Sequence, residues 1–113
     1  MNTDLVVETI SRADGIIIAL IGAADLGGSE KLDRQLMIVS AQHPKNIVFD
    51  LSRMTFISSL CMGSLVRFQS ACRHWGGKVR LAAASPDVAG ALLRARLNQV
   101  LPMTNSVEEA FAA

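Results

Sequence analysis

Short apolar segments and longer amphipathic segments alternate along the chain. Four of the short segments carry β-branched or other apolar side chains and are bounded by turn or polar residues, which predicts strands. They are residues 4–13 (DLVVETISRA), 15–24 (GIIIALIGAA), 46–52 (NIVFDLS) and 78–84 (KVRLAAA). A further short extended piece is expected at 100–103 (VLPM). The Asp14-Gly15 pair is a turn signal, so the first two strands are expected to pair antiparallel.

Helices are predicted between and after these strands, from apolar positions at helical spacing and from capping residues. The helical segments are residues 27–42, the stretch from Ser58-Ser59 to Gly76-Gly77, the stretch opened by Ser85-Pro86-Asp87, and residues 106–113. Ser29 and Ser85 are candidate N-caps, and Ser106 with Glu109 forms a candidate capping box. The glycine pair is expected to end the second helix.

This order of elements predicts the fold class. Strands that alternate with helices pair in parallel through right-handed crossovers, and residues 46–52 are expected at the centre. We therefore expect an α/β fold over residues 1–113, as a single domain. Its mixed sheet is predicted to have four or five strands, with helices packed mainly on one face and one antiparallel edge.

The helix that follows the serine pair suggests a docking surface. At about 100° per residue, one face carries only residues suited to packing on the sheet, namely Cys61, Leu65, Phe68, Cys72 and Trp75. Arg67, Ser70 and His74 fall roughly opposite. Between the two faces lie Ser59, Met62, Gly63 and Val66. We expect Met62 and Val66 to be exposed beside the Ser59 hydroxyl, and Gly63 to permit close approach by another backbone.

Structural alternatives remain open for each of these residues. Ser58 or Ser59 alone would serve as an ordinary N-cap. Met62 and Val66 would be buried if a further layer of structure covered that side of the helix. Asp25, which follows the second strand, is equally well explained as a turn or cap residue.

Charge and composition exclude several classes of function. The 113 residues carry a net charge of +1, with scattered basic residues, four Phe, one Trp and no Tyr. This composition argues against binding of nucleic acid, and no cofactor is expected. The apolar run 15–24 is too short to span a bilayer and has no positively charged start, so we expect neither membrane insertion nor a signal peptide.

The cysteines and histidines do not form a recognisable site. Cys61 and Cys72 would lie about 16 Å apart on one helix, which excludes a disulfide and favours reduced thiols in a cytoplasmic protein. A metal site is not expected. His74 lies about four turns from Ser59, and His43 is placed at the opposite end of the central strand, so no base serves a nucleophile. We therefore expect no enzymatic activity.

Three segments resemble a known family, the STAS domain of bacterial anti-sigma factor antagonists. The family pattern Phe-Ile-Asp-Ser-Ser-Gly-Leu-Gly, preceded by a strand that ends in Asp-Leu-Ser, is similar to NIVFDLSRMTFISSLCMGSLV at 46–66. The family's later Gly-Gly, strand and Ser-Pro-x-Val segment resembles GGKVRLAAASPDVAGALL at 76–93. The ending LNQVLPMTNSVEEAFAA at 97–113 is also similar to the family.

The resemblance implies a role for particular residues. The family's phosphoacceptor serine matches Ser59, its preceding Asp matches Ser58, and its final Gly matches Gly63. Leu60 and Cys61 stand where the family has a second hydroxyl residue and a glycine. Asp25 matches an Asp that is often found near the phosphorylation site. On this basis we expect Ser59 to be the phosphoacceptor, with Ser58, Met62, Gly63, Val66 and Asp25 forming the partner-binding surface.

The resemblance also implies partners. The expected function is a regulatory protein–protein interaction module, an anti-sigma factor antagonist that binds an anti-sigma factor that is itself a serine kinase. Phosphorylation of Ser59 would end this contact, and a serine phosphatase would restore it. Apart from the resemblance, Arg67 lies near enough on the predicted helix to pair with the phosphate in part. The alternative is an adaptor without phosphorylation, in a signalling complex or as a soluble subunit of a membrane transporter. The sequence leaves the oligomeric state open.

Overall fold

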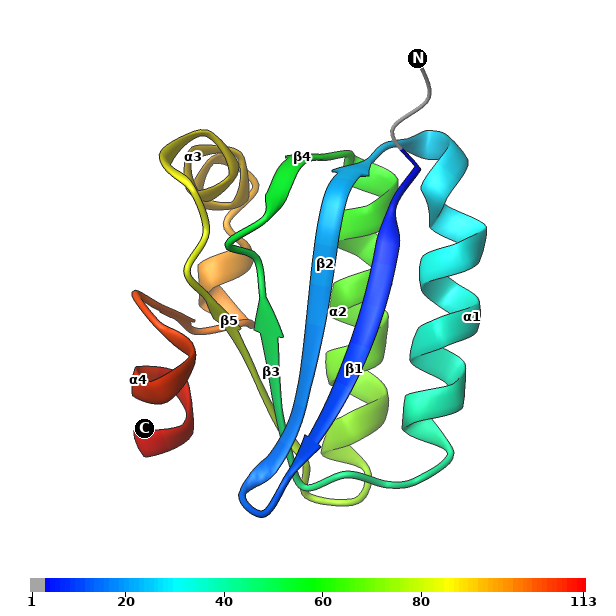
Figure 1. Ribbon diagram of the computed structural model, residues 1–113, viewed down its shortest axis with the longest axis vertical. Coiled ribbons are helices and arrows are strands. Elements are labelled where there is room, and N and C mark those ends of the chain that lie inside the picture. The colour runs from blue at the N-terminus through cyan, green and yellow to red at the C-terminus, as the bar shows by residue number, and fades with distance from the viewer. Residues whose placement is uncertain (1–3) are drawn as a thin grey trace.

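The computed structural model of the protein describes residues 4–113 (Figure 1). Its six strands are β1 (Val6–Arg12), β2 (Gly15–Ala24), β3 (Asn46–Asp50), β4 (Met54–Ile57), β5 (Lys78–Ala82) and β6 (Met103–Thr104). Its four α-helices are α1 (Ser29–Ser40), α2 (Ser59–Arg73), α3 (Pro86–Arg94) and α4 (Val107–Ala112). Two short 3₁₀ turns, η1 (Leu26–Gly28) and η2 (Leu97–Gln99), precede α1 and follow α3.

The sheet has the order β1-β2-β3-β5-β6, with β4 paired to the far end of β2. Only the β1–β2 pair is antiparallel, and the other pairs are parallel, which confirms the predicted mixed sheet around a central β3. The sheet has six strands where the sequence predicted four or five. The additional strand β4 forms because the ten-residue β2 extends beyond the end of β3. Residues Ile16–Ala19 of β2 pair with β3, and Gly22–Ala24 pair with β4 after a register shift.

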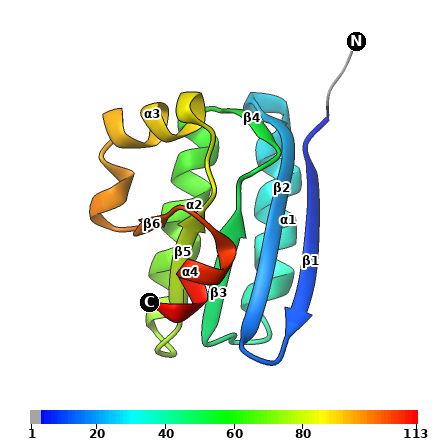
Figure 2. The same ribbon diagram turned by 60° about the vertical axis from the view of Figure 1, so that its left-hand side comes forward.

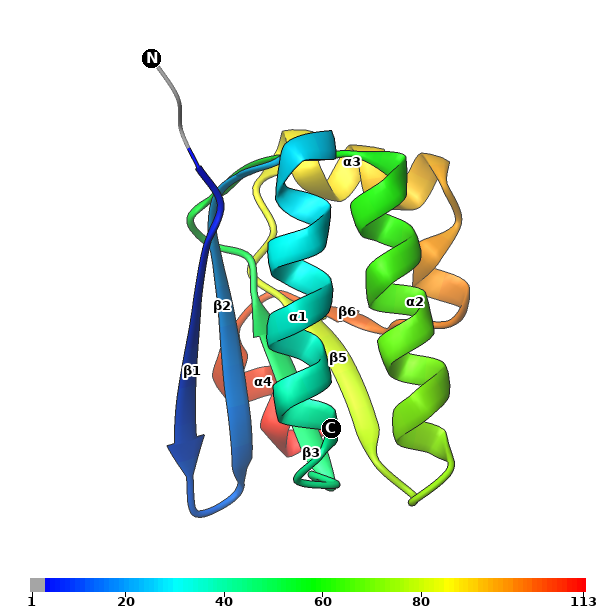
Figure 3. The same cartoon turned by 90° about the vertical axis from the view of Figure 1, so that its right-hand side faces the viewer.

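Helices cover the two faces of the sheet unequally. Figure 3 shows α1 and α2 side by side on one face, where the large core lies. On β3, Ile47 and Phe49 belong to that core, whereas Val48 packs with Ala110 of α4 in a second, smaller core. Figure 2 shows α4 against the sheet on this other face. The third helix lies against β4 at the end of the sheet. The prediction that the helices lie mainly on one face therefore holds for the two longest helices.

Local sequence signals set the ends of most elements. Ser85 caps α3 ahead of Pro86, and Ser106 caps α4 by accepting a hydrogen bond from the Glu109 N–H, as predicted. Ser29 is the first residue of α1 rather than its cap, and its hydroxyl donates to the Leu26 carbonyl of η1. Gly15 has a positive φ of 151°, and any Cβ there would meet the Asn46 carbonyl oxygen at 2.2 Å. The tight β1–β2 turn therefore requires glycine.

Candidate functional site

The two serines at the start of α2 have different environments. Ser58 is in an extended conformation, is only 8% exposed, and accepts a hydrogen bond through Oγ from the Cys61 N–H at 3.2 Å. Its own N–H donates to the Ala24 carbonyl at the end of β2. Ser58 therefore serves as the N-cap of α2 and ties the start of that helix to the sheet.

Ser59 is the first residue inside α2, and it is exposed. Within residues 4–113 its hydroxyl makes no hydrogen bond to another protein group, because Ser58 already caps the helix. The sequence left open which serine caps the helix, and the structure assigns that role to Ser58. The Ser59 hydroxyl thus remains free to react or to contact a partner.

The structure corrects the prediction that Met62 and Val66 are exposed. Met62 is 8% exposed and belongs to the main core, and Val66 is half-buried against that core. The physical reason is the further layer of structure that the sequence left open. Met62 is buried in the same apolar cluster as Leu97 and Leu101, which follow α3, and Val66 packs against that cluster.

Other apolar residues are exposed around Ser59 instead. Leu26 in η1 is 68% exposed, Phe56 on β4 is 51% exposed, and Leu60 on α2 is 48% exposed. The three segments meet at the start of α2, since η1 packs on α2 and β4 leads into it. We call Leu26, Phe56 and Leu60 the apolar rim. Single exposed apolar residues are ordinary on a protein surface, but three on segments that adjoin the start of α2 are compatible with a protein partner there, although Phe56 also lines a hollow with Pro86 and Ala91 of α3.

The sequence contained no signal for this apolar rim. Leu60 and Met62 lie about 100° to either side of Cys61 around α2, so helical periodicity alone does not show that Leu60 is exposed and Met62 is buried. Phe56 and Leu26 gave no signal either. Their exposure depends on β4 being an edge strand and on η1 being a turn, neither of which was predicted.

Asp25 lies beside this surface and acts as a cap. Its carboxylate accepts a hydrogen bond from the Gly28 N–H at 3.1 Å, which stabilises η1. Its backbone carbonyl accepts the Cys61 thiol at 3.4 Å, so the Asp25 turn is attached to the first turn of α2. The structure therefore supports the turn-or-cap interpretation of Asp25, although the residue remains exposed next to the start of α2.

Gly63 and Arg67 follow Ser59 at intervals of four residues on α2. A Cβ built on Gly63 would come within 4 Å of one group only among the described residues, the guanidinium of Arg67 at 3.2 Å. No backbone from another element approaches Gly63, so a close approach there would have to come from a partner. Arg67 itself contacts Ser64 and Asp33 rather than Ser59.

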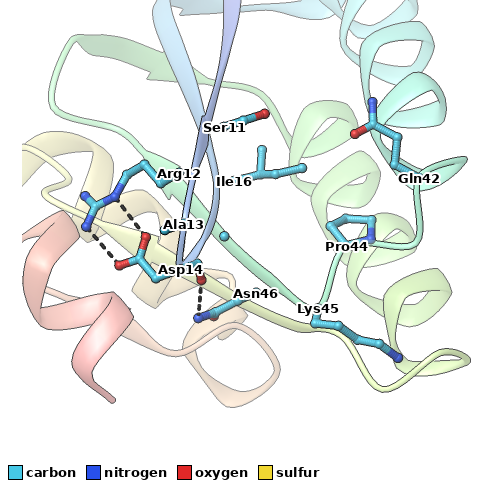
Figure 4. A pocket seen from close by; sticks show the side chains of 10 residues that line it. Ser11, Arg12, Ala13, Asp14, Ile16, Gln42, Pro44, Lys45 and Asn46 are labelled. Carbon is cyan, nitrogen blue, oxygen red and sulfur yellow. Dashed lines mark hydrogen bonds and ion pairs between the residues drawn. The ribbon is translucent and has the colours of Figure 1, made fainter.

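The groups whose pKa values are shifted by the fold are either paired or buried. A hollow of about 320 Å³ at the β1–β2 turn has Arg12 and Asp14 on its wall, and Figure 4 shows them bonded to each other. Arg12 also holds Glu108, and this hydrogen bond lowers the pKa of Glu108 below its ordinary value. Burial raises the pKa of the free Cys72 thiol to about 11. Within residues 4–113, no cluster of three potential metal ligands is present, and no helix has the length and apolar character needed to cross a membrane.

Fold and site together define a class of protein. It is a small mixed α/β domain with an exposed serine hydroxyl at the start of a helix and exposed apolar side chains on the adjoining segments. The STAS domain model matches residues 4–110, and the chain belongs to this family. The predicted family resemblance is thereby confirmed.

Known proteins similar to this chain include anti-sigma factor antagonists. The chain is 26% identical over 106 residues to BtrV of Bordetella bronchiseptica, whose name assigns it to the anti-sigma factor antagonists, and the match covers 93% of this chain and 91% of that protein. A crystal structure of an anti-sigma factor antagonist from Mycobacterium paratuberculosis superposes with a TM-score of 0.89 at 17% identity, covering 96% of this chain and 92% of that one.

Two further structures show the range of proteins that share the fold. The phosphorylated form of the Bacillus cell fate determinant SpoIIAA has a TM-score of 0.69 at 18% identity and covers 96% of each chain. A sulfate transporter family protein from Wolinella succinogenes has a TM-score of 0.72 at 24% identity, covering 85% of this chain and 80% of that one. At these identities the structural likeness establishes the fold alone.

Proposed function

We propose that this protein is an anti-sigma factor antagonist whose partner binding is switched by phosphorylation of Ser59. The observation that carries the proposal is that two adjacent serines have different structural roles. Ser58 is buried and caps α2, whereas Ser59 is exposed, unbonded within the described residues, and flanked by the apolar rim. The similarity to BtrV supports the choice of partner class, an anti-sigma factor.

Ser58 stands where the family pattern has Asp, and its capping hydrogen bond supports the compatibility of this change with the proposed site. Serine and aspartate are among the preferred N-cap residues, because either side chain accepts a hydrogen bond from the first turn. The Ser58 Oγ does this for the Cys61 N–H. The start of α2 is therefore held in place without the carboxylate.

Phosphorylation of Ser59 would act on the partner more than on the fold. A phosphate adds about −1.5 to −2 charges at pH 7. At the start of a helix this charge is favourable for the helix itself, by about 0.3–1 kcal/mol at an exposed position. A partner that buries Leu26, Phe56 and Leu60 would instead have to desolvate the phosphate beside them, which is unfavourable unless the partner supplies a counter-charge.

The partner in this scheme is an anti-sigma factor that is also a serine kinase and transfers phosphate from ATP to the Ser59 hydroxyl. A serine phosphatase then hydrolyses the phosphoserine and restores binding. While Ser59 is unmodified, this protein binds the anti-sigma factor and the sigma factor is free. Ser59 is chosen over Ser58 because a kinase has to reach the hydroxyl, and Ser58 is 8% exposed with its oxygen already accepting a hydrogen bond.

The test uses purified anti-sigma factor kinases of the source organism and four forms of this chain: wild type, Ser59→Ala, Ser59→Glu and Ser70→Glu. Ser70 is exposed on α2, far along the helix from Ser59, and provides a control of equal charge. We expect Ser59→Ala and Ser70→Glu to bind as wild type does, and Ser59→Glu to bind at least tenfold more weakly. All four should have similar thermal melts. Equal binding by Ser59→Glu and wild type would contradict the proposal.

The second candidate function is an adaptor that binds through the same surface without phosphorylation. Leu60, which replaces the family's second hydroxyl residue, favours it, and the transporter family neighbour shows that the fold occurs outside sigma factor regulation. Mass spectrometry after incubation with the bound kinase and ATP separates the two functions. Phosphate on Ser59 supports the switch, and unmodified protein that remains bound supports the adaptor.

A further inference from the structure

Arg67 lies two turns after Ser59 on α2, and its side chain folds back toward the start of the helix. Its Nη1 lies 3.2 Å from the position that a Cβ on Gly63 would occupy. Such a contact is tighter than ordinary packing, so a Cβ at position 63 would make the guanidinium shift by a few tenths of an ångström. Gly63 therefore leaves open the strip of helix surface that runs from Arg67 toward Ser59.

The present partners of Arg67 hold it weakly. Its Nη2 donates to the Ser64 hydroxyl at 3.2 Å and lies 3.5 Å from the Asp33 carboxylate on α1. The side chains of Arg67 and Asp33 are 63% and 49% exposed, so water screens their attraction. A stronger anion within reach would compete effectively for this guanidinium.

Resting on the function proposed above, we propose that Arg67 receives the Ser59 phosphate: after phosphorylation its guanidinium leaves Asp33 and pairs with the phosphate along the strip that Gly63 leaves open. Ser59, Gly63 and Arg67 are four residues apart in turn, so they follow one side of the helix. The distance from Ser59 to Arg67 along the axis is about 12 Å. The guanidinium already lies beside Gly63, which is one helical turn from Ser59. The phosphoserine side chain, together with a small movement of Arg67, has to bridge only this remaining turn.

Charge favours the exchange. Asp33 offers one negative charge, whereas a phosphoserine carries nearly two at pH 7 and presents three strong acceptor oxygens. Arginine also matches phosphate geometry with two parallel N–H donors. Asp33 is the acidic side chain that faces Arg67 from the neighbouring helix, and Ser64 is the polar side chain that bonds it from α2.

As a consequence, phosphorylation of Ser59 on α2 also changes the charged surface of α1. Pairing with the phosphate removes the only ion pair between α1 and α2 in the described part of the chain, and it leaves the Asp33 carboxylate without Arg67. The phosphorylated surface then presents negative charge on both helices. A partner that contacts this side of the molecule would distinguish the two forms at Asp33 as well as at Ser59.

The test places phosphoserine at position 59 during synthesis, by genetic encoding, so that no kinase is needed. The second pKa of the phosphate, ordinarily about 6, is followed by ³¹P NMR at low salt in four proteins. They are the wild-type background, Arg67→Gln, Gly63→Ala and the control Arg73→Gln. Arg73 is an exposed arginine in the last turn of the same helix, so its removal changes the net charge equally at a remote position.

We expect the phosphate pKa to be about 0.4–0.7 lower in the wild-type background than in Arg67→Gln. This is the shift that one positive charge produces in water at a distance of about 7 to 4 Å from the phosphate. Arg73→Gln should match the wild-type background, and Gly63→Ala should lose part of the difference, because its methyl group displaces the guanidinium. Equal values in Arg67→Gln and the wild-type background would overturn the inference. So would an equal change in Arg73→Gln, which would show only the effect of net charge.

This experiment separates the inference from the proposed function. If the phosphate pKa depends on Arg67 but no kinase of the organism modifies Ser59, the proposed switch fails and the Arg67 contact stands. If a kinase modifies Ser59 and binding is lost, but the phosphate pKa is independent of Arg67, the switch stands and the role of Arg67 is excluded.

Discussion

Replacing Ser58 by alanine tests whether the two serines at the start of α2 have separate roles. The substitution removes the Oγ that accepts the hydrogen bond from the Cys61 N–H at 3.2 Å. Cys61 is fully buried and Ser58 is 8% exposed, so water cannot readily replace the lost acceptor. The same substitution at Ser59 removes an exposed hydroxyl with no hydrogen bond in the described structure.

The expected magnitude follows from the environment of the cap. Replacing a serine N-cap by alanine typically costs about 0.5–2 kcal/mol. Because the freed N–H is buried, we place Ser58→Ala in the upper part of this range, at about 1–2 kcal/mol. Ser59→Ala should stay within about 0.5 kcal/mol of wild type, as is usual for a surface substitution. With a urea slope of about 2 kcal/mol/M, the unfolding midpoint of Ser58→Ala should fall by about 0.5–1 M.

Urea unfolding followed by circular dichroism measures both variants. Ser58→Asp is the matched control, since aspartate also accepts the cap hydrogen bond and its charge is favourable at a helix start. It should retain most of the stability that Ser58→Ala loses. If Ser58→Ala and Ser59→Ala lose the same free energy of unfolding, or if Ser58→Ala loses none, the assignment of the cap to Ser58 is wrong.

Two further predictions test other parts of the structure. Met62→Ala should cost about 2–4 kcal/mol because the side chain is in the core, whereas Leu60→Ala should change the free energy of unfolding by no more than about 0.5 kcal/mol; similar losses in urea unfolding would refute the burial of Met62. The pKa of Glu108 should lie below its ordinary value and return toward it in Arg12→Gln, as read by NMR of the side-chain carboxyl. Because folding lowers this pKa, the stabilisation is complete above the ordinary carboxyl pKa of about 4.3 and is lost as the pH falls through the lower folded value; an unchanged Glu108 titration in Arg12→Gln would contradict this.

The candidate site could be predicted only in part. Ser59 was chosen as the candidate phosphoacceptor from its place in the family pattern, but only the structure showed that Ser58 caps α2 and that the Ser59 hydroxyl is exposed. The apolar residues beside it were assigned to Met62 and Val66, and the structure places exposed apolar side chains at Leu26, Phe56 and Leu60 instead. Helical periodicity identifies one buried face, but it cannot say whether a second side of the helix is covered by a segment more than thirty residues later in the chain.

The sequence by itself determined the four α-helices, most of the strands and their order, but not β4 or the two 3₁₀ turns. Capping serines, the Asp14-Gly15 turn and the alternation of strands with helices act through residues close in the chain, so they can be recognised without coordinates. Only the tertiary structure decided that β2 pairs with two successive strands, that Met62 is buried in one cluster with residues after α3, and that Arg67 lies against Gly63 and Asp33. These features depend on contacts between residues distant in sequence, and burial is a property of the assembled layers rather than of any one segment.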